Sequence, residues 1–126
     1  MTTLETPRHR VEGLGSAHSG VQQFWHLRVT GAALGVLSVW FAYVALGLAT
    51  ANQISVLAFL QHPLNAVLMG AFMLLCAYHM TLGLREVIED YVHTNGLKIL
   101  LLLSVRIFGF AVAITAAVAL LRIATP

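Results

Sequence analysis

His79 is the side chain in this sequence with the clearest chemical potential. The chain has six histidines, and only His79 lies deep inside a long apolar run. An ionisable group in such a run is costly and often marks a functional site. One interpretation is a packing histidine that hydrogen-bonds to a neighbouring helix. The other is an axial ligand of haem iron, because neutral imidazole is a preferred ligand of that metal.

Gly83 lies four residues after His79 and therefore on the same helical face. A missing side chain there would leave room for a flat macrocycle, although small residues also serve plain helix packing. A low-spin haem needs two axial ligands, and this chain offers one at a suitable depth. The haem hypothesis therefore predicts that another chain supplies the second ligand.

A second group of polar residues follows in the same segment: Arg85, Glu86, Glu89, Asp90 and Tyr91. If the helix continues at about 1.5 Å per residue, Tyr91 lies roughly 18 Å from His79, at the membrane boundary. The ordinary interpretation is an aromatic anchor beside a solvated helix end. The functional alternative is a quinone site, in which the Tyr91 hydroxyl donates to a quinone carbonyl and Asp90 orients it or relays protons.

Two arginines stand close to or inside apolar runs. Arg28 precedes the first run, and Arg106 lies some ten residues into the last one. Both could extend their charged ends toward lipid head groups. Arg28 could instead pair with a haem propionate, because its planar guanidinium matches a carboxylate. For Arg106, a helix–helix contact and a cofactor contact both remain open.

Three apolar runs must position these residues. They extend over about Val29–Ala49, Pro63–Leu84 and Leu97–Ala124 in a chain that is 59% hydrophobic and 10% charged, with mean hydropathy +0.84. Each run reaches the roughly 20 residues that cross a bilayer as a helix. We therefore predict an all-α membrane protein that forms part of a multi-chain helix bundle. Residues 1–126 form one membrane-anchor domain, with a short cytoplasmic N-terminal arm over 1–28, including a short helix from near Ser19, and transmembrane helices at about 29–49, 63–88 and 98–122.

Charge and composition set the orientation and exclude several functions. Lys and Arg concentrate in the arm and in the second loop, whereas the first loop, Thr50–His62, has none, so the N-terminus is predicted to be cytoplasmic. The net charge of +2 has no clustered basic face for nucleic acid. The single cysteine, Cys76, excludes an internal disulfide and an iron–sulfur cluster held by this chain alone.

Two motifs resemble the small hydrophobic membrane-anchor subunit of succinate dehydrogenase, respiratory complex II. The first is GLGSAHSG followed by WHLRVTG, ahead of the first apolar run. The second places Gly83, Val87 and the pair Asp90–Tyr91 at set intervals after His79. The plan of three apolar segments with short loops agrees as well, so the resemblance covers nearly the whole chain.

The resemblance implies roles for particular residues. His79 would ligate haem b, with the other ligand from the larger membrane-anchor subunit. Tyr91 would hydrogen-bond to a ubiquinone carbonyl, with Asp90 as its acidic neighbour, and Arg28 would lie near the haem propionates and the quinone pocket. In this family a flavoprotein subunit oxidises succinate in the tricarboxylic acid cycle, and an iron–sulfur subunit passes the electrons to quinone. The chain itself would hold no flavin or iron–sulfur cluster and have no independent activity.

Two other functions remain as alternatives. The chain could be a cofactor-free structural anchor, or a small membrane transport component in which His79 and Arg106 line a path. Because the sequence shows neither a secretory signal nor a transit peptide, we expect a bacterial inner membrane, with the mitochondrial inner membrane as the alternative.

Overall fold

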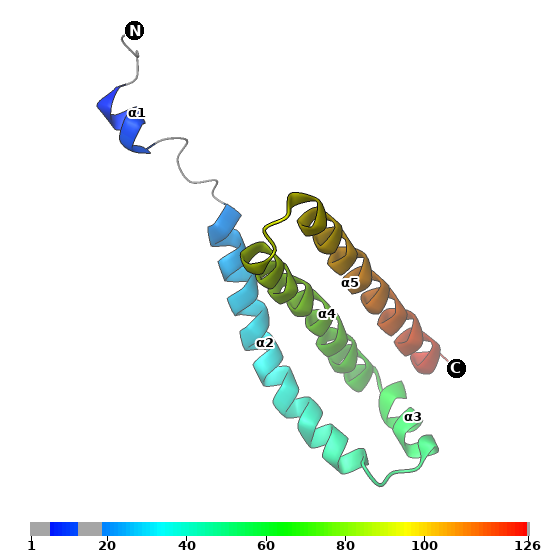
Figure 1. Ribbon diagram of the computed structural model, residues 1–126. Helices are drawn as coiled ribbons and strands as arrows, with labels where there is room; N and C mark the ends of the chain where they lie inside the picture. The colour runs from blue at the N-terminus through cyan, green and yellow to red at the C-terminus, as the bar shows by residue number, and fades with distance from the viewer. Residues whose placement is uncertain (1–5, 13–18, 126) are drawn as a thin grey trace.

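The computed structural model describes residues 6–12 and 19–125, which form α-helices joined by short connections (Figure 1). The helices are α1 (Pro7–Glu12), α2 (Ser19–Leu48), α3 (Gln53–Gln61), α4 (Pro63–Tyr91) and α5 (Asn95–Ala124). Three of them, α2, α4 and α5, are long and apolar enough to cross a membrane. The prediction of an all-α protein with three membrane-spanning helices is therefore confirmed.

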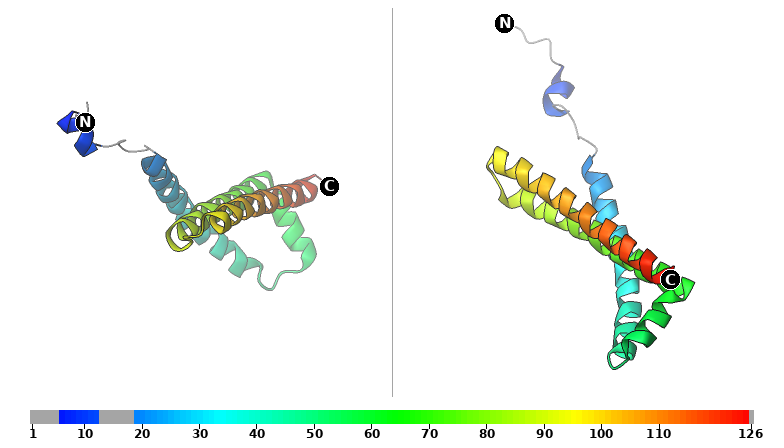
Figure 2. Two further views of the ribbon diagram at one scale, coloured as in Figure 1. Left: turned by 45° about the horizontal axis from the view of Figure 1, so that its top comes forward. Right: turned by 90° about the vertical axis from the view of Figure 1, so that its right-hand side faces the viewer.

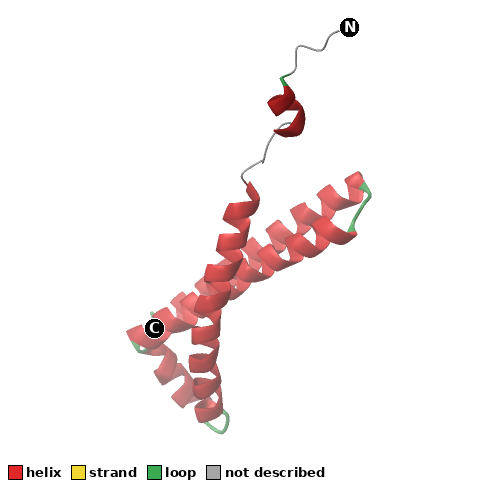
Figure 3. Ribbon diagram, turned by 90° about the vertical axis from the view of Figure 1, so that its left-hand side faces the viewer, coloured by secondary structure: helices red, strands yellow, loops and turns green. Residues whose placement is uncertain are grey.

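The three long helices do not pack as equal partners. Helices α4 and α5 run side by side along their length, whereas α2 crosses α4 at an oblique angle (Figures 1 and 2). Figure 3 shows this crossing from the other side. The start of α2 and the C-terminus lie at opposite ends of the bundle, as an odd number of spanning helices requires. α4 is therefore the central helix, with contacts to both neighbours.

The N-terminal part differs from the sequence prediction in two respects. A helix does begin at Ser19, but it continues without a break to Leu48, so residues 19–28 are the first turns of α2. The short helix α1 was not predicted. Residues 1–5 and 13–18 of the predicted arm lie outside the described residues.

The segment predicted as the first loop contains the helix α3. Its N-cap residue, Asn52, accepts a hydrogen bond from the backbone of the first turn at 2.9 Å. Pro63 then begins α4, where its missing N–H costs nothing. The Asn65 side chain donates to the Phe59 carbonyl at 3.0 Å, which joins the end of α3 to the start of α4.

Few side chains are buried within the described chain. The buried apolar residues are Val44, Ala77, Ile88 and Ala116, and the buried polar residue is Thr30. Large apolar side chains are exposed on all three long helices. Helices that are apolar on every side must be covered by lipid or by other helices. The surface of this chain therefore suits a membrane and neighbouring subunits better than water.

Candidate functional site

His79 lies in the middle part of α4 and faces α2. Its Nδ1 atom is 2.8 Å from the hydroxyl oxygen of Thr30. Thr30 is only 7% exposed, and its hydroxyl is also 2.6 Å from the backbone carbonyl of His26, one helical turn earlier. A buried polar contact in an apolar setting fixes the relative position of the two groups. The ring of His79 is thus held in place where α2 and α4 cross.

A glycine of α2 lies against the imidazole ring of His79. A side chain at Gly31 would meet the ring, because an added Cβ would lie 3.3 Å from Cε1 of His79. An added Cβ at Gly83, on the same face of α4 one turn later, would meet nothing within 4 Å. Gly31 therefore lets the ring approach α2, and the position that a Gly83 side chain would take on α4 is open.

The second ring nitrogen of His79, Nε2, has no hydrogen-bond partner among the described residues. A packing histidine would account for the bond to Thr30 but not for the free nitrogen. In a membrane-spanning segment an unpaired polar atom is costly. No group of three or more possible metal ligands occurs in the described part of the chain. A metal at His79 would therefore need a ligand from elsewhere.

A second pair of residues reinforces the same crossing. The hydroxyl of Tyr78 on α4 lies 3.2 Å from Nδ1 of His26 on α2. The two rings meet edge to face, with centroids 6.2 Å apart. The sequence interpretation did not identify these partners. The motif WHLRVTG contains both His26 and Thr30, but their partners on α4 depend on how the two helices cross.

Tyr91 and Asp90 lie at the C-terminal end of α4 and are exposed, Tyr91 by 78%. Consecutive helical residues point to different faces, and neither side chain makes a hydrogen bond to another described residue. The structure brings them together neither with His79 nor with Arg28. The Arg28 guanidinium instead lies over the Phe24 ring, 4.2 Å from its centroid.

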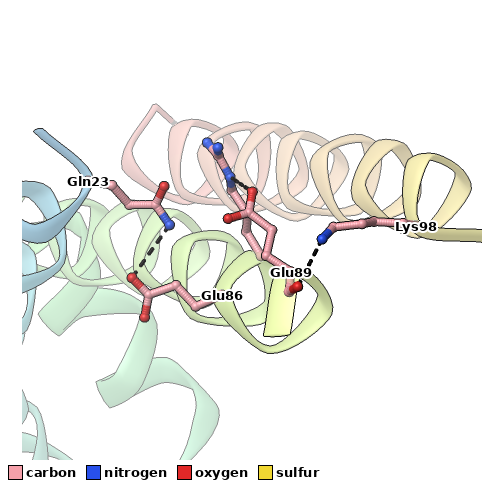
Figure 4. Close-up of polar contacts among 5 residues, drawn as sticks. Gln23, Glu86, Glu89 and Lys98 are labelled. Carbon is pink, nitrogen blue, oxygen red and sulfur yellow. Dashed lines mark hydrogen bonds and ion pairs between the residues drawn. The ribbon is translucent and has the colours of Figure 1, made fainter. Parts of the chain in front are cut away.

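Charged residues form polar contacts at the end of α4 that carries Tyr91. Glu89 accepts a hydrogen bond from Arg85 at 2.7 Å, and its backbone carbonyl accepts one from Lys98 on α5 at 2.8 Å. Nearby, the Gln23 amide of α2 approaches Glu86 at 3.4 Å, a long contact. Figure 4 shows Gln23 and Lys98 reaching α4 from the two neighbouring helices. These contacts fix the last turns of α4 and leave Asp90 and Tyr91 facing outward.

A groove of about 440 Å³ runs between α4 and α5. Its lining includes Arg85, Glu89 and Arg106 but not His79, which faces α2. The structure therefore places His79 and Arg106 on different sides of α4. This separation weighs against a shared path through the chain that both residues would line.

Comparison with known proteins gave consistent matches over most of the chain. A family model described as the succinate dehydrogenase/fumarate reductase transmembrane subunit matches residues 2–119. The succinate dehydrogenase hydrophobic membrane anchor subunit of Paracoccus denitrificans is 38% identical over 117 residues, which are 93% of this chain and 90% of that protein. The protein of the same name from Rickettsia conorii is 34% identical over 113 residues, 88% of this chain and 89% of that protein. No solved structure matches the chain.

Proposed function

The chain belongs to the succinate dehydrogenase/fumarate reductase transmembrane subunit family, and on this premise we propose that it is the small membrane-anchor subunit of a succinate:quinone oxidoreductase. In this role it contributes one axial ligand to haem b and one wall of the quinone-reduction site. The observation that carries the proposal is the state of His79. One ring nitrogen is held by Thr30, and the other is free of hydrogen bonds within the described chain.

The residues around His79 fit one half of a haem site. A ligating histidine usually binds the metal with one nitrogen and hydrogen-bonds with the other, which fixes the ring orientation. Gly83 supplies the space for a flat group on the same helical face. When bound, haem b supplies a one-electron redox centre inside the membrane. The second ligand would come from the larger membrane-anchor subunit, since His26, the other histidine in a described spanning helix, is bonded to Tyr78.

The exposed end of α4 supplies the quinone half of the proposal. The Tyr91 phenol can donate a hydrogen bond to a quinone carbonyl, and the Asp90 carboxylate can orient that phenol or relay protons beside it. Arg28 lies on α2 between His26 and Thr30, whose partners on α4 are Tyr78 and His79. Its positive charge would pair with a haem propionate or line the quinone pocket. The quinone, for which we propose ubiquinone, would be bound between these residues and the iron–sulfur and larger anchor subunits.

The exposed apolar surface of the three long helices supports the proposal of an anchor. The flavoprotein and iron–sulfur subunits would dock on the side that carries Tyr91, and the larger anchor would cover part of the helix surface. By the distribution of Lys and Arg, this side faces the cytoplasm of a bacterial inner membrane.

A reduced-minus-oxidised optical spectrum of the purified complex tests the haem part of this function. The wild-type complex should show a b-type band, and His79→Leu should remove or strongly distort it. The matched control is His62→Leu, which changes a histidine between α3 and α4 and should leave the band unchanged. A wild-type complex without the band would instead indicate the cofactor-free structural anchor. An unchanged band in His79→Leu would show that His79 is not the ligand.

A further inference from the structure

The hydroxyl of Thr30 has two kinds of neighbour, and the distances decide where its single proton lies. Its oxygen is 2.6 Å from the His26 carbonyl oxygen and 3.2 Å from the Leu27 carbonyl oxygen. Two oxygens at 2.6 Å repel each other unless a proton lies between them, and this distance is typical of an O–H···O hydrogen bond. Thr30 therefore donates its proton to the backbone of α2.

The remaining lone pairs of the Thr30 oxygen can only accept a hydrogen bond. Nδ1 of His79 lies 2.8 Å from this oxygen and must therefore carry the hydrogen that joins them. A neutral imidazole has one N–H, so the lone pair used for binding a metal is on Nε2. The hydrogen bonds from His79 through Thr30 to the His26 carbonyl thus select one of the two tautomers of His79.

We propose that Thr30 is a positioning residue for the haem, acting through His79. This inference rests on the proposed function, because it takes His79 as the axial ligand. The Thr30 oxygen holds His79 with Nδ1 protonated and leaves the lone pair of Nε2 free for the iron. As an acceptor at Nδ1–H, it also increases the electron density on the ring and the basicity of Nε2, as partners of ligating histidines commonly do.

The proposal differs from a purely structural role of Thr30 in joining two helices. A structural contact would affect the stability of the subunit but not the electronic properties of the haem. A more basic Nε2 favours the ferric state over the ferrous state, because the more highly charged iron gains more from a strong donor. Loss of the acceptor should therefore raise the midpoint potential of haem b and weaken its binding.

The test compares three variants in the assembled complex. Thr30→Val removes the hydroxyl at nearly constant volume, and Thr30→Ser keeps it. Thr115→Val is the matched control, because Thr115 also donates to a carbonyl one turn earlier, that of Ala111 at 2.7 Å, but it is exposed and has no histidine partner. If Thr30→Val does not assemble, Thr30→Ala removes the same hydroxyl without adding an atom and takes its place.

Two measurements report on the haem itself: redox titration of its midpoint potential and its rate of transfer to apomyoglobin. Thr30→Val should raise the potential and speed haem loss about 10–100-fold, the usual cost of removing such a partner. Thr30→Ser and Thr115→Val should resemble the wild type in both. Unchanged values in Thr30→Val, or equal changes in Thr30→Ser, would overturn the inference.

The two proposals fail in different ways. If His79→Leu leaves the haem band intact, the ligand assignment itself is wrong, whatever Thr30 does. If His79→Leu removes the band while Thr30→Val changes neither measurement, His79 is the ligand and Thr30 only packs against it.

Discussion

Around His79 the polar side chains of α4 bond to α2, whereas around Tyr91 they face outward from the end of the same helix. His79 and Tyr78 both have partners on α2, at 2.8 and 3.2 Å. Tyr91 and Asp90 have no side-chain hydrogen bonds within the described chain and are exposed to the surroundings. The two regions belong to one continuous helix but differ in how far this chain completes them.

The difference indicates what each region requires from other subunits. The orientation of His79 is set within this chain, so under the proposed function a partner would need to add only the second haem ligand. The orientation of Tyr91 depends on the backbone of α4, which Lys98 and Arg85 brace through Glu89. A quinone pocket at Tyr91 would therefore be closed by the other subunits. Substitutions should consequently act on haem properties in the first region and on quinone reduction in the second.

The largest effect is expected for Tyr91→Phe, which tests whether the two regions are independent. Removing the phenolic hydroxyl should lower quinone reduction about 100-fold, the typical contribution of a positioned proton donor. The haem spectrum and succinate oxidation with an artificial acceptor should stay unchanged. The measurement is the ratio of the two activities in the purified complex.

Tyr43→Phe is the matched control for Tyr91→Phe, because the Tyr43 side chain is as exposed as that of Tyr91, at 79% against 78%. Tyr43 lies near the C-terminal end of α2, away from the end of α4. It should leave both activities unchanged. Equal losses of both activities in Tyr91→Phe would indicate defective assembly rather than a quinone contact, and the division between the two regions would then be wrong.

The hydropathy pattern was sufficient to predict the spanning helices, because a segment inside lipid must form its backbone hydrogen bonds within itself. It also suggested His79, as an ionisable residue in a long apolar run. It could not identify Thr30, because that contact depends on where α2 crosses α4, and a shift of one helical turn would give a different partner. The helix α3 was missed because its nine residues are too short to span a bilayer, although Asn52 and Pro63 are typical boundary residues.

Gly31→Ala should have a smaller effect, confined to the His79 region. The added Cβ would lie 3.3 Å from the His79 ring, so the ring must move by a few tenths of an ångström. Mild overpacking of this kind costs roughly 1 kcal/mol, which corresponds to about fivefold faster haem loss. Gly35→Ala, one turn further along α2, would meet nothing within 4 Å and should behave as the wild type. Identical rates for both variants would show that the ring does not depend on the close approach at Gly31.

The smallest effect is expected for Lys98→Met, which removes the brace on the Tyr91 region without touching the exposed residues themselves. Lys98 donates to the Glu89 carbonyl in the last turn of α4, at 2.8 Å. Side chains that donate to the last carbonyls of a helix contribute modestly to its stability, so the last turn of α4 should fray. Because Tyr91 stands on that turn, the KM for quinone should rise about twofold. The haem potential should not change, because the hydrogen bond that holds His79 comes from α2.

Arg122→Met, in the last turn of α5 at the other end of the bundle, is the control and should leave the KM unchanged. A shifted haem potential in Lys98→Met would contradict the separation, because it would mean that the end of α4 transmits its position to the ring of His79.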